Sequence, residues 1–168
     1  LERQLDFVDI DKSTYAISEI EFEKKIINLK KKRKKVGCVI VTDYAGIPAN
    51  WTKINKLKAK YGFKIINDNC HAIGSKYLNS NKYAVKYADI VVQSYHAIKN
   101  ITTGEGGSIL TNKRDIYKKI SLFKTHGITR SINEKKKFGL WYYDVKTVGL
   151  NFRLYDIQCA VGLSQFTK

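Results

Sequence analysis

Residues 50–71 read NWTKINKLKAKYGFKIINDNCH, and this stretch decides the fold class. Its first residue, Asn50, is a good helix N-cap, because its side-chain oxygen can accept a hydrogen bond from a free backbone N–H. The apolar residues that follow recur at helical spacing and form one face: Trp51, Ile54, Leu57 and Tyr61. Gly62 suits the left-handed position that ends a helix, and the apolar run at 63–66 then predicts a strand. A helix that leads directly into a strand predicts an α/β fold.

The same alternation continues on both sides of this unit. Upstream, we expect strands at 5–10 and 36–41, joined by a helix that a capping box at Ser18–Glu21 opens. Downstream, we expect a strand at 89–93 and another at 107–111. The last strand returns too soon for a crossover helix, so it should run antiparallel to its predecessor. The pattern therefore predicts a mostly parallel sheet with one antiparallel strand.

Three further elements complete the expected architecture. A helix should begin at Asn112 as its cap, an exposed loop should occupy 129–137, and a last helix should begin near Asp156. The apolar stripe of that last helix is formed by Ile157, Ala160, Val161 and Phe166. A chain of 168 residues with 43% hydrophobic content has enough apolar material for one sizeable core, so we expect a single domain.

Composition excludes several classes of protein. No apolar run approaches the roughly 20 residues of a membrane span, and the polar start, Leu1–Gln4, lacks a signal-peptide layout. The three cysteines, Cys38, Cys70 and Cys159, are far apart and form no C-x-x-C pair. We therefore expect a soluble cytoplasmic chain with reduced thiols and without a metal site.

The formal net charge of +16 would attract a nucleic acid, an anionic lipid or a phosphorylated small molecule. The basic run at 30–35 raises the possibility of a nucleic-acid-binding module. This run lies between a predicted helix and a predicted strand and has no interleaved aromatic residues for base stacking, which favours a solvated connector. The chain also contains no methionine, and its last helical pattern stops at Lys168 without a terminator, so we expect a piece of a longer protein.

The ends of two predicted strands carry side chains that can react or bind a ligand. One strand leads into Asp68 and His71, and the next leads into Ser94 and Lys99. In an open α/β sheet, ligands bind beyond the carboxyl ends of the strands, because the loops there are free to vary over a rigid sheet. A carboxylate, an imidazole, a hydroxyl and an amine can therefore converge at one edge.

Together with TTGEGG at 102–107, this set resembles the core of the sugar aminotransferases named after DegT, DnrJ, EryC and StrS. These are pyridoxal phosphate (PLP) enzymes of fold type I. The resemblance extends to residues 7–11, 43–48, 126–127 and 149–153. It implies a three-layer α-β-α large domain that binds the cofactor. Residues 1–168 would form part of this domain, without the N-terminal segment and the C-terminal small domain.

The resemblance also implies roles for individual residues. Lys99 would form the Schiff base with the cofactor and then move a proton as a base. Asp68 would keep the ring nitrogen protonated, and His71 would hydrogen-bond the ring hydroxyl oxygen. Ser94 would bind the phosphate, as would Asn151, which comes from the neighbouring subunit in this family and so makes a homodimer part of the mechanism.

The substrate is suggested by motifs at 126–130, 141–143 and 156–158, which look most like the pseudaminic acid pathway branch of the family. That branch aminates a UDP-linked 4-keto-6-deoxy sugar with nitrogen from glutamate. A PLP-dependent sugar dehydratase of the same family is the alternative, although its best-known members replace the lysine with histidine. Three side chains stay without an assigned role: Glu105, His126 and Arg153. Tyr95, Ala97 and Asn69–Cys70 depart from the family pattern, in which phenylalanine, proline and small residues are usual, respectively.

Overall fold

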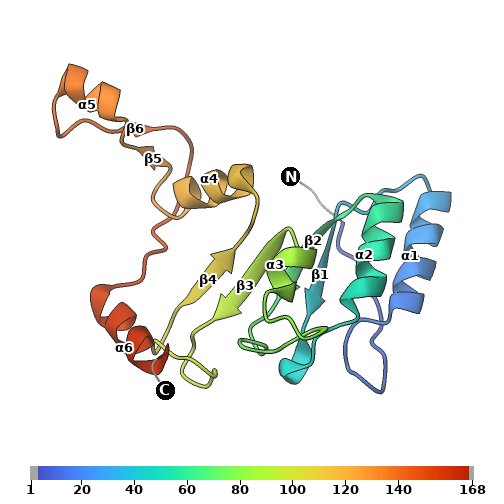
Figure 1. Ribbon diagram of the computed structural model, residues 1–168. Coiled ribbons are helices and arrows are strands. Elements are labelled where there is room, and N and C mark those ends of the chain that lie inside the picture. The colour runs from blue at the N-terminus through green and yellow to red at the C-terminus, as the bar shows by residue number, and fades with distance from the viewer. Residues whose placement is uncertain (1–3, 167–168) are drawn as a thin grey trace.

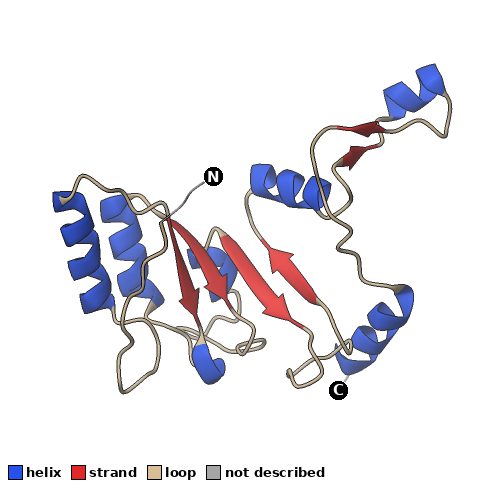
Figure 2. Cartoon of the chain, turned by 180° about the vertical axis from the view of Figure 1, so that it is seen from behind, coloured by secondary structure: helices blue, strands red, loops and turns tan. Residues whose placement is uncertain are grey.

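The computed structural model describes residues 4–166, and its centre is a four-stranded sheet (Figure 1). The strands are β1 (Cys38–Thr42), β2 (Lys64–Asp68), β3 (Ile90–Ser94) and β4 (Gly107–Leu110), and they lie side by side in this order. The pairs β1–β2 and β2–β3 are parallel, whereas β4 runs antiparallel to β3 (Figure 2). The expected mostly parallel sheet with one antiparallel strand is confirmed.

α2 (Trp51–Tyr61) connects β1 to β2, and the short α3 (Tyr83–Tyr87) connects β2 to β3, whereas α1 (Glu19–Lys31) precedes β1. The predicted caps form. The hydroxyl of Ser18 accepts from the Glu21 N–H at 3.3 Å, and the side chain of Asn50 accepts from the Lys53 N–H at 3.2 Å. Gly62 ends α2 with a φ of 75°, in the left-handed region that favours glycine.

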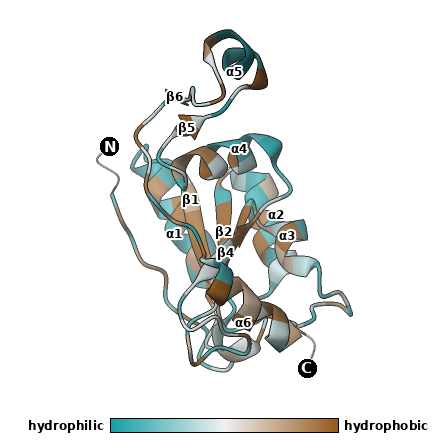
Figure 3. Ribbon diagram, turned by 90° about the vertical axis from the view of Figure 1, so that its left-hand side faces the viewer, coloured by the Kyte–Doolittle hydropathy of each residue, from teal (hydrophilic) through white to brown (hydrophobic). Residues whose placement is uncertain are grey.

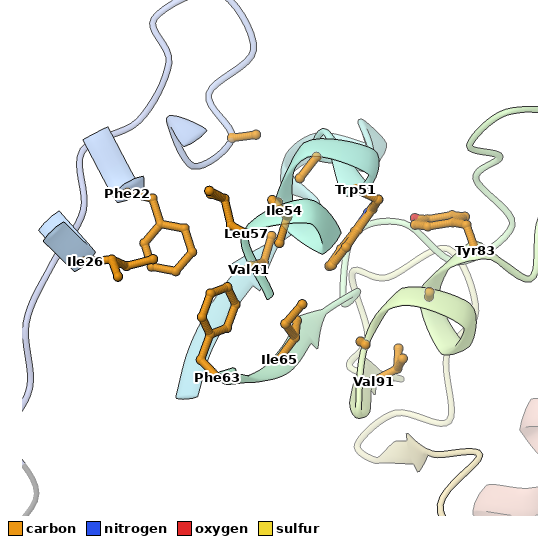
Figure 4. Close-up of a cluster of buried hydrophobic side chains, with 14 residues drawn as sticks. Phe22, Ile26, Val41, Trp51, Ile54, Leu57, Phe63, Ile65, Tyr83 and Val91 are labelled. Atoms are coloured by element: carbon orange, nitrogen blue, oxygen red, sulfur yellow. The ribbon is translucent and has the colours of Figure 1, made fainter. Parts of the chain in front are cut away.

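The core lies between these helices and one face of the sheet. Figure 4 shows Val41, Ile65 and Val91 of the three parallel strands in one buried cluster with Ile54 and Leu57 of α2. All five are buried, because they occupy the alternate strand positions and the helix face that the sequence pattern predicts. Phe22 of α1 and Phe63, just before β2, extend this core with an edge-on ring contact at 5.2 Å.

The opposite face of the sheet is much more accessible. Ile40 of β1 and Ile109 of β4 point to this face and are 65% and 49% exposed. The helices within residues 4–166 thus supply one layer against the sheet, the layer formed by α1, α2 and α3. The chain exposes 12343 Å², whereas a folded monomer of this size exposes about 8,500 Å². The expected sizeable core is present, but it covers only one face of the sheet and leaves much of the chain's surface exposed.

The rest of the chain extends away from the sheet (Figure 1). It consists of α4 (Arg114–Phe123), β5 (Ile128–Thr129), α5 (Ile132–Phe138), β6 (Asp144–Val145) and α6 (Asp156–Phe166). β5 and β6 form a small antiparallel pair, and α6 lies near the loop that follows β3 (Figure 1). Figure 3 colours several stretches of this part as hydrophobic, and many of its large apolar side chains are exposed.

Two predicted elements of the sequence analysis are wrong. Residues 5–10 form no strand, because they find no neighbouring strand among residues 4–166; only Ile10 makes an isolated bridge, to Ile17. A strand pattern needs a partner before it becomes a strand. Asn112 does not cap α4: its side-chain amide donates to the Val85 carbonyl at 3.0 Å, and Lys113 occupies the cap position without a side-chain hydrogen bond.

The C-terminal expectations also need correction. The predicted loop at 129–137 contains the end of β5 and most of α5, since Ser131 caps a short helix by accepting from the Glu134 N–H. The stripe of Ile157, Ala160, Val161 and Phe166 is exposed on α6, because no other described element packs against it. The expectations for Leu1–Arg3 and for the chain end at Lys168 lie outside the described residues.

Candidate active site

The strand register brings Asp68 and Ser94 to the same edge and face of the sheet. Asp68 is the last residue of β2 and lies opposite Val92 of β3, two residues before Ser94. Side chains two residues apart on a strand point to the same face. Asp68 and Ser94 therefore both point to the face opposite the core, at the carboxyl ends of neighbouring parallel strands.

The loops after β1, β2 and β3 line an open hollow of about 340 Å³. Its lining residues are Ala45, Gly46, His71, Ser75, Ile98, Lys99 and Asn100. The volume lies within the range of roughly 300–1,000 Å³ that is typical of small-molecule sites. His71 follows β2 and Lys99 follows β3, so two of the predicted functional side chains share this hollow.

The third wall of the hollow comes from the loop after β1. This loop contains the short 3-10 helix η1 (Tyr44–Gly46), and Gly46 has a φ of 82°. A Cβ at Gly46 would lie 3.4 Å from the His71 carbonyl oxygen, which is tight, so glycine allows this close approach. The hydroxyl of Ser75 donates to the Gly46 carbonyl at 2.7 Å, and the rings of Tyr44 and His71 lie 5.8 Å apart.

The charges of Asp68 and Lys99 both affect the pKa of the Cys70 thiol. The Cys70 N–H donates to the Asp68 carboxylate at 3.1 Å. Burial raises the pKa of the Cys70 thiol, and the hydrogen bond to Asp68 and its negative charge raise it further, to about 11. The positive charge of Lys99 lowers the same pKa. The carboxylate and the ammonium group therefore both lie within electrostatic range of the Cys70 sulfur, from adjoining strand ends.

A turn that begins at Ser94 positions Lys99. The Ser94 hydroxyl accepts from the His96 N–H at 3.3 Å, and the His96 carbonyl accepts from the Lys99 N–H at 3.0 Å. The ring of His96 also lies 3.7 Å from the Glu105 carboxylate, measured from Nε2 to Oε1. The hydroxyl of Ser94 is thus placed at the end of β3, next to the turn that carries the lysine.

The far side of the Lys99 loop is tied to α6. Thr103 is buried, and its N–H donates to the Tyr95 carbonyl at 3.0 Å. Gln158 of α6 donates to the Glu105 carbonyl at 3.0 Å. A Cβ at Gly162 of α6 would lie 2.9 Å from the Thr103 side chain, so this glycine lets the helix pack closely against the loop. The backbone of Glu105, whose role the sequence left open, therefore anchors α6.

Asn151 is the one predicted cofactor residue that the structure keeps apart from this cluster. It forms an isolated bridge with Thr125, just after α4, and is exposed. The side chain of Arg153 donates to the Asn151 oxygen at 2.7 Å. His126, the third residue without an assigned role, has a φ of 60° and donates from its N–H to the Leu150 carbonyl. This hydrogen bond joins the start of the β5 segment to the segment of Asn151.

Sequence reasoning missed several residues of the site. Gly46 lies within the stretch 43–48 that carried the resemblance, but nothing in its pattern indicated a place beside His71. Ser75 and Asn100 had no signal of their own. Asp43, the first residue of the same stretch, is fully buried and organises the loops around the site, as described below.

The donor set fits PLP. Lys99 and His71 line the hollow, and Asp68 and Ser94 lie at the same edge of the sheet. These are the groups that can bind an aldehyde, a ring oxygen, a pyridine nitrogen and a phosphate. Gly46 allows the loop after β1 to approach His71 closely. Among the described residues, no three His, Cys, Asp or Glu side chains are grouped so that they could hold a metal ion.

A mostly parallel sheet with one antiparallel strand, carrying these groups at the ends of β2 and β3, defines the α/β fold of the fold type I aminotransferases. The chain belongs to the DegT/DnrJ/EryC1/StrS aminotransferase family, whose model matches residues 3–168.

Three similar proteins place the chain within this family. The UDP-4-amino-4,6-dideoxy-N-acetyl-beta-L-altrosamine transaminase of Helicobacter pylori is 40% identical over 152 residues, which are 90% of this chain and 36% of the relative. The structure of Helicobacter pylori PseC, an aminotransferase involved in the biosynthesis of pseudoaminic acid, matches with a TM-score of 0.80 and 36% identity over 95% of this chain and 39% of PseC.

The third is Spr1654 of Streptococcus pneumoniae, a putative sugar aminotransferase solved in its PMP form, which matches with a TM-score of 0.77 and 26% identity over 95% of this chain and 43% of that protein. The chain therefore spans about 40% of the length of the relatives that it matches.

Proposed function

We propose that the intact protein is a PLP-dependent aminotransferase that transfers an amino group from glutamate to a nucleotide-linked 4-keto-6-deoxy sugar, in a UDP-sugar, surface glycan or nonulosonic acid pathway. The observation that carries this proposal is the shared hollow of His71 and Lys99, next to Asp68 on the adjoining strand end. Membership of an aminotransferase family supports the reaction class.

The protein's own residues have separate tasks at this site. PLP, when bound, supplies an electron sink that stabilises negative charge at the carbon bearing the amine. Asp68 would hold a proton on the ring nitrogen, since a carboxylate stabilises the positive charge there. His71 would orient the ring by a hydrogen bond to its hydroxyl oxygen. Ser94 would hold the phosphate with its hydroxyl, alongside backbone N–H groups.

Lys99 is the residue that we expect to move the proton. Lys99 lines the hollow, at the end of a turn that the Ser94 and His96 hydrogen bonds define. A base at this position can move a proton between the amine-bearing carbon of the amino donor and the cofactor. The same amine would hold the cofactor covalently before the donor arrives.

A second copy of the chain is part of the proposal, as the homodimer expected from the family. Asn151 would serve the site of the partner, since within one copy it lies beside Thr125 and apart from Lys99. The segment after α5 exposes large apolar side chains, namely Leu140, Trp141, Val148, Phe152, Ile157 and Leu163. Exposed apolar surface of this kind is typical of protein–protein interfaces.

The substrate part of the proposal rests on similarity to the Helicobacter pylori transaminase, whose name specifies a UDP-linked amino sugar. Glutamate as donor follows from the resemblance to the pseudaminic acid branch. Within residues 4–166, no helix is long and apolar enough to cross a membrane. We place the reaction in the cytoplasm, where the thiols of Cys38, Cys70 and Cys159 stay reduced.

The basic run at 30–35, which raised the possibility of nucleic-acid binding, lies away from the candidate active site. It includes the end of α1 and the turn before β1, and so lies at the amino-terminal edge of the sheet. The hollow lies at the carboxyl-terminal edge. An exposed connector with solvated lysines accounts for the run. Salt-sensitive retention of random duplex DNA by the intact protein, without any cofactor signal, would reverse this assignment.

The direct test is to add PLP to the intact protein, record the yellow absorbance, reduce with borohydride and map the modified peptide. We expect one labelled lysine, Lys99. Lys99→Arg should remove the label and all transamination, whereas Lys53→Arg, an exposed lysine on α2, should change neither. A label on another lysine would contradict the proposal. A panel of UDP- and dTDP-linked keto sugars, with glutamate or glutamine as donor, then identifies the substrates.

A further inference from the structure

Asp43, directly after β1, is the centre of a buried polar network. It is fully buried, and its carboxylate accepts hydrogen bonds from the Ala49 N–H at 2.9 Å and the Trp51 indole at 3.1 Å. It also accepts from the side chains of Asn67 at 3.1 Å and Asn69 at 3.0 Å. The last donor is the Tyr83 hydroxyl at 2.9 Å. A buried carboxylate needs such donors, because burial without them carries a large free-energy penalty.

Asn69 carries this network from Asp43 toward the next strand. The amide group of its side chain is buried, and its oxygen accepts from the Gln93 side chain at 3.3 Å. Gln93 is on β3 and directly faces Ser108 of β4. The hydroxyl of Ser108 donates to the Gln93 oxygen at 3.3 Å.

This series of hydrogen bonds ends at Tyr95. The oxygens of Ser108 and Tyr95 are 2.7 Å apart. Since the one hydroxyl hydrogen of Ser108 is directed to Gln93, the Tyr95 hydroxyl is the donor in this contact. The side chains of Asp43, Asn69, Gln93, Ser108 and Tyr95 therefore form a continuous row of hydrogen bonds, from the end of β1 to β4. We refer to these five residues as the polar row.

Two members of the polar row, Asn69 and Tyr95, are attached to the candidate active site. Asn69 follows Asp68 in the chain, and its N–H is held by the Val92 carbonyl at 2.9 Å. The backbone of Tyr95 holds the base of the Lys99 loop, because its carbonyl accepts from the Thr103 N–H and its N–H donates to the Gly106 carbonyl at 2.8 Å. The strand end that carries Asp68 and the loop that carries Lys99 are thus joined beneath the site by side chains that do not line the hollow.

We propose that Asn69 and Tyr95 are positioning residues, which couple the Asp68 strand end to the Lys99 loop through the polar row. This inference rests on the proposed function for the identity of the groups that are positioned. Hydrogen bonds in a partly buried row polarise one another and permit few alternative geometries. A displacement of one end is therefore transmitted to the other, and the spacing between the carboxylate and the amine stays constant.

The first test measures backbone amide hydrogen exchange in the intact protein without PLP. Asn69→Ala breaks the polar row between Asp43 and Gln93 and should speed exchange at 99–106, and Tyr95→Phe, which removes only a hydroxyl, should speed exchange at 68–71. One lost hydrogen bond corresponds to about fivefold faster exchange. Tyr117→Phe, a matched change of an exposed tyrosine on α4, should leave both segments unchanged.

Ser108→Ala provides an independent break in the middle of the polar row. Ser108 is half-buried, so this variant tests the coupling even if Asn69→Ala does not fold. We expect faster exchange at both distant segments. Exchange that changes only beside the substituted residue, in Ser108→Ala and Tyr95→Phe alike, would overturn the inference.

The second test uses the enzyme loaded with PLP and separates this inference from the proposed function. Tyr95→Phe should lower kcat by about tenfold with KM unchanged, because misplacement of reacting groups affects the chemical step rather than substrate binding. Borohydride labelling of Lys99 should persist in this variant. If coupled exchange is seen but Lys99 is never labelled, the proposed function fails and the coupling stands. If Lys99 is labelled but the distant exchange and kcat stay at their original values, the coupling fails alone.

Discussion

His71 and Lys99 line one hollow although 27 intervening residues separate them in the chain. They meet because the strands that precede them are parallel neighbours, so that both loops begin at the same edge of the sheet. Neither loop contains a helix or strand that would bring the two side chains together. The relationship is a consequence of strand order.

The first prediction concerns the reactivity of Cys70 in the cofactor-free intact protein. Its pKa of about 11 makes the thiol slow to alkylate near neutral pH, because the thiolate is the reactive form. Asp68→Asn removes a negative charge and should speed alkylation by iodoacetamide, whereas Lys99→Gln removes a positive charge and should slow it. Peptide mass mapping across a pH series gives both rates. Exposed Cys159, on α6, is the internal control and should react equally in all variants. Equal rates at Cys70 in both variants would refute the shared location of the two charges.

The second prediction concerns Asp68 in the enzyme loaded with PLP. Asn is nearly isosteric with Asp but cannot stabilise a positive ring nitrogen, so Asp68→Asn should lower kcat/KM by at least about 100-fold. The absorbance of the bound cofactor should remain, because Lys99 is intact. Asp115→Asn, an exposed position on α4, is the matched control and should retain full activity. Full activity of Asp68→Asn would remove Asp68 from the site.

The third prediction concerns stability at acid pH. Burial of Asp89 raises the pKa of its carboxyl group, but hydrogen bonds from Lys113, from Lys58 at 2.8 Å and from the Ile65 N–H outweigh this effect and hold the pKa at about 2. The ordinary value is 3.8, so the folded state binds this proton less tightly than the unfolded state. The resulting stabilisation is present above about pH 4 and is lost as the pH falls toward 2.

The expected contribution of Asp89 is about 2 kcal/mol, from the difference between the two pKa values. Urea titrations at pH 7, 4 and 3 should show the free energy of unfolding of the native protein falling across this range. In Asp89→Asn, stability at pH 7 should be lower and this part of the pH dependence should be absent. An unchanged slope between pH 4 and pH 3 in the variant would show that another carboxylate is responsible.

The fourth prediction compares two glycines with similar backbone angles. Gly62 has a φ of 75° and Gly127 a φ of 70°, so alanine carries the same left-handed penalty of roughly 1–2 kcal/mol at both positions. A Cβ at Gly62 meets nothing within 4 Å, whereas a Cβ at Gly127 would lie 1.7 Å from the Thr147 carbonyl oxygen. Gly127→Ala must therefore displace the segment that leads to Asn151.

We expect Gly62→Ala to lower the free energy of unfolding by about 1 kcal/mol in urea titrations. Gly127→Ala should make residues 122–150 markedly more sensitive to limited proteolysis, with Gly62→Ala as the control for backbone strain alone. Equal proteolysis of the two variants would mean that the contact with Thr147 is not maintained in solution.

Elements whose hydrogen bonds involve residues close in the sequence were predicted correctly, whereas an element that needs a distant partner was not. The caps at Ser18 and Asn50 and the left-handed end at Gly62 were correct, because each involves neighbours within four residues. The antiparallel direction of the last strand of the sheet was also correct, because a short connection excludes a crossover. The strand at 5–10 was wrong, because strand formation depends on a partner that no local pattern specifies.

The candidate site divides in the same way. The order of a carboxylate, an imidazole, a hydroxyl and an amine after two apolar runs predicted that these groups converge at one sheet edge. The family resemblance then named PLP as the cofactor and Asp68, His71, Ser94 and Lys99 as its residues, and these roles stay predictions. Gly46 and the polar row had no such signal, because their partners lie on other strands. Asn69 and Tyr95 stood out only as departures from a family pattern.

The sequence by itself determined the alternation of helices and strands, the helix ends and the residue types at two strand ends, because these depend on side-chain periodicity and on hydrogen bonds between near neighbours. The tertiary structure alone decided that His71 and Lys99 share a hollow, that Asn151 lies apart from them, and that a row of hydrogen bonds connects Asp43 to Tyr95. These relationships depend on strand order and register, which arise when distant segments pair and bury a common core.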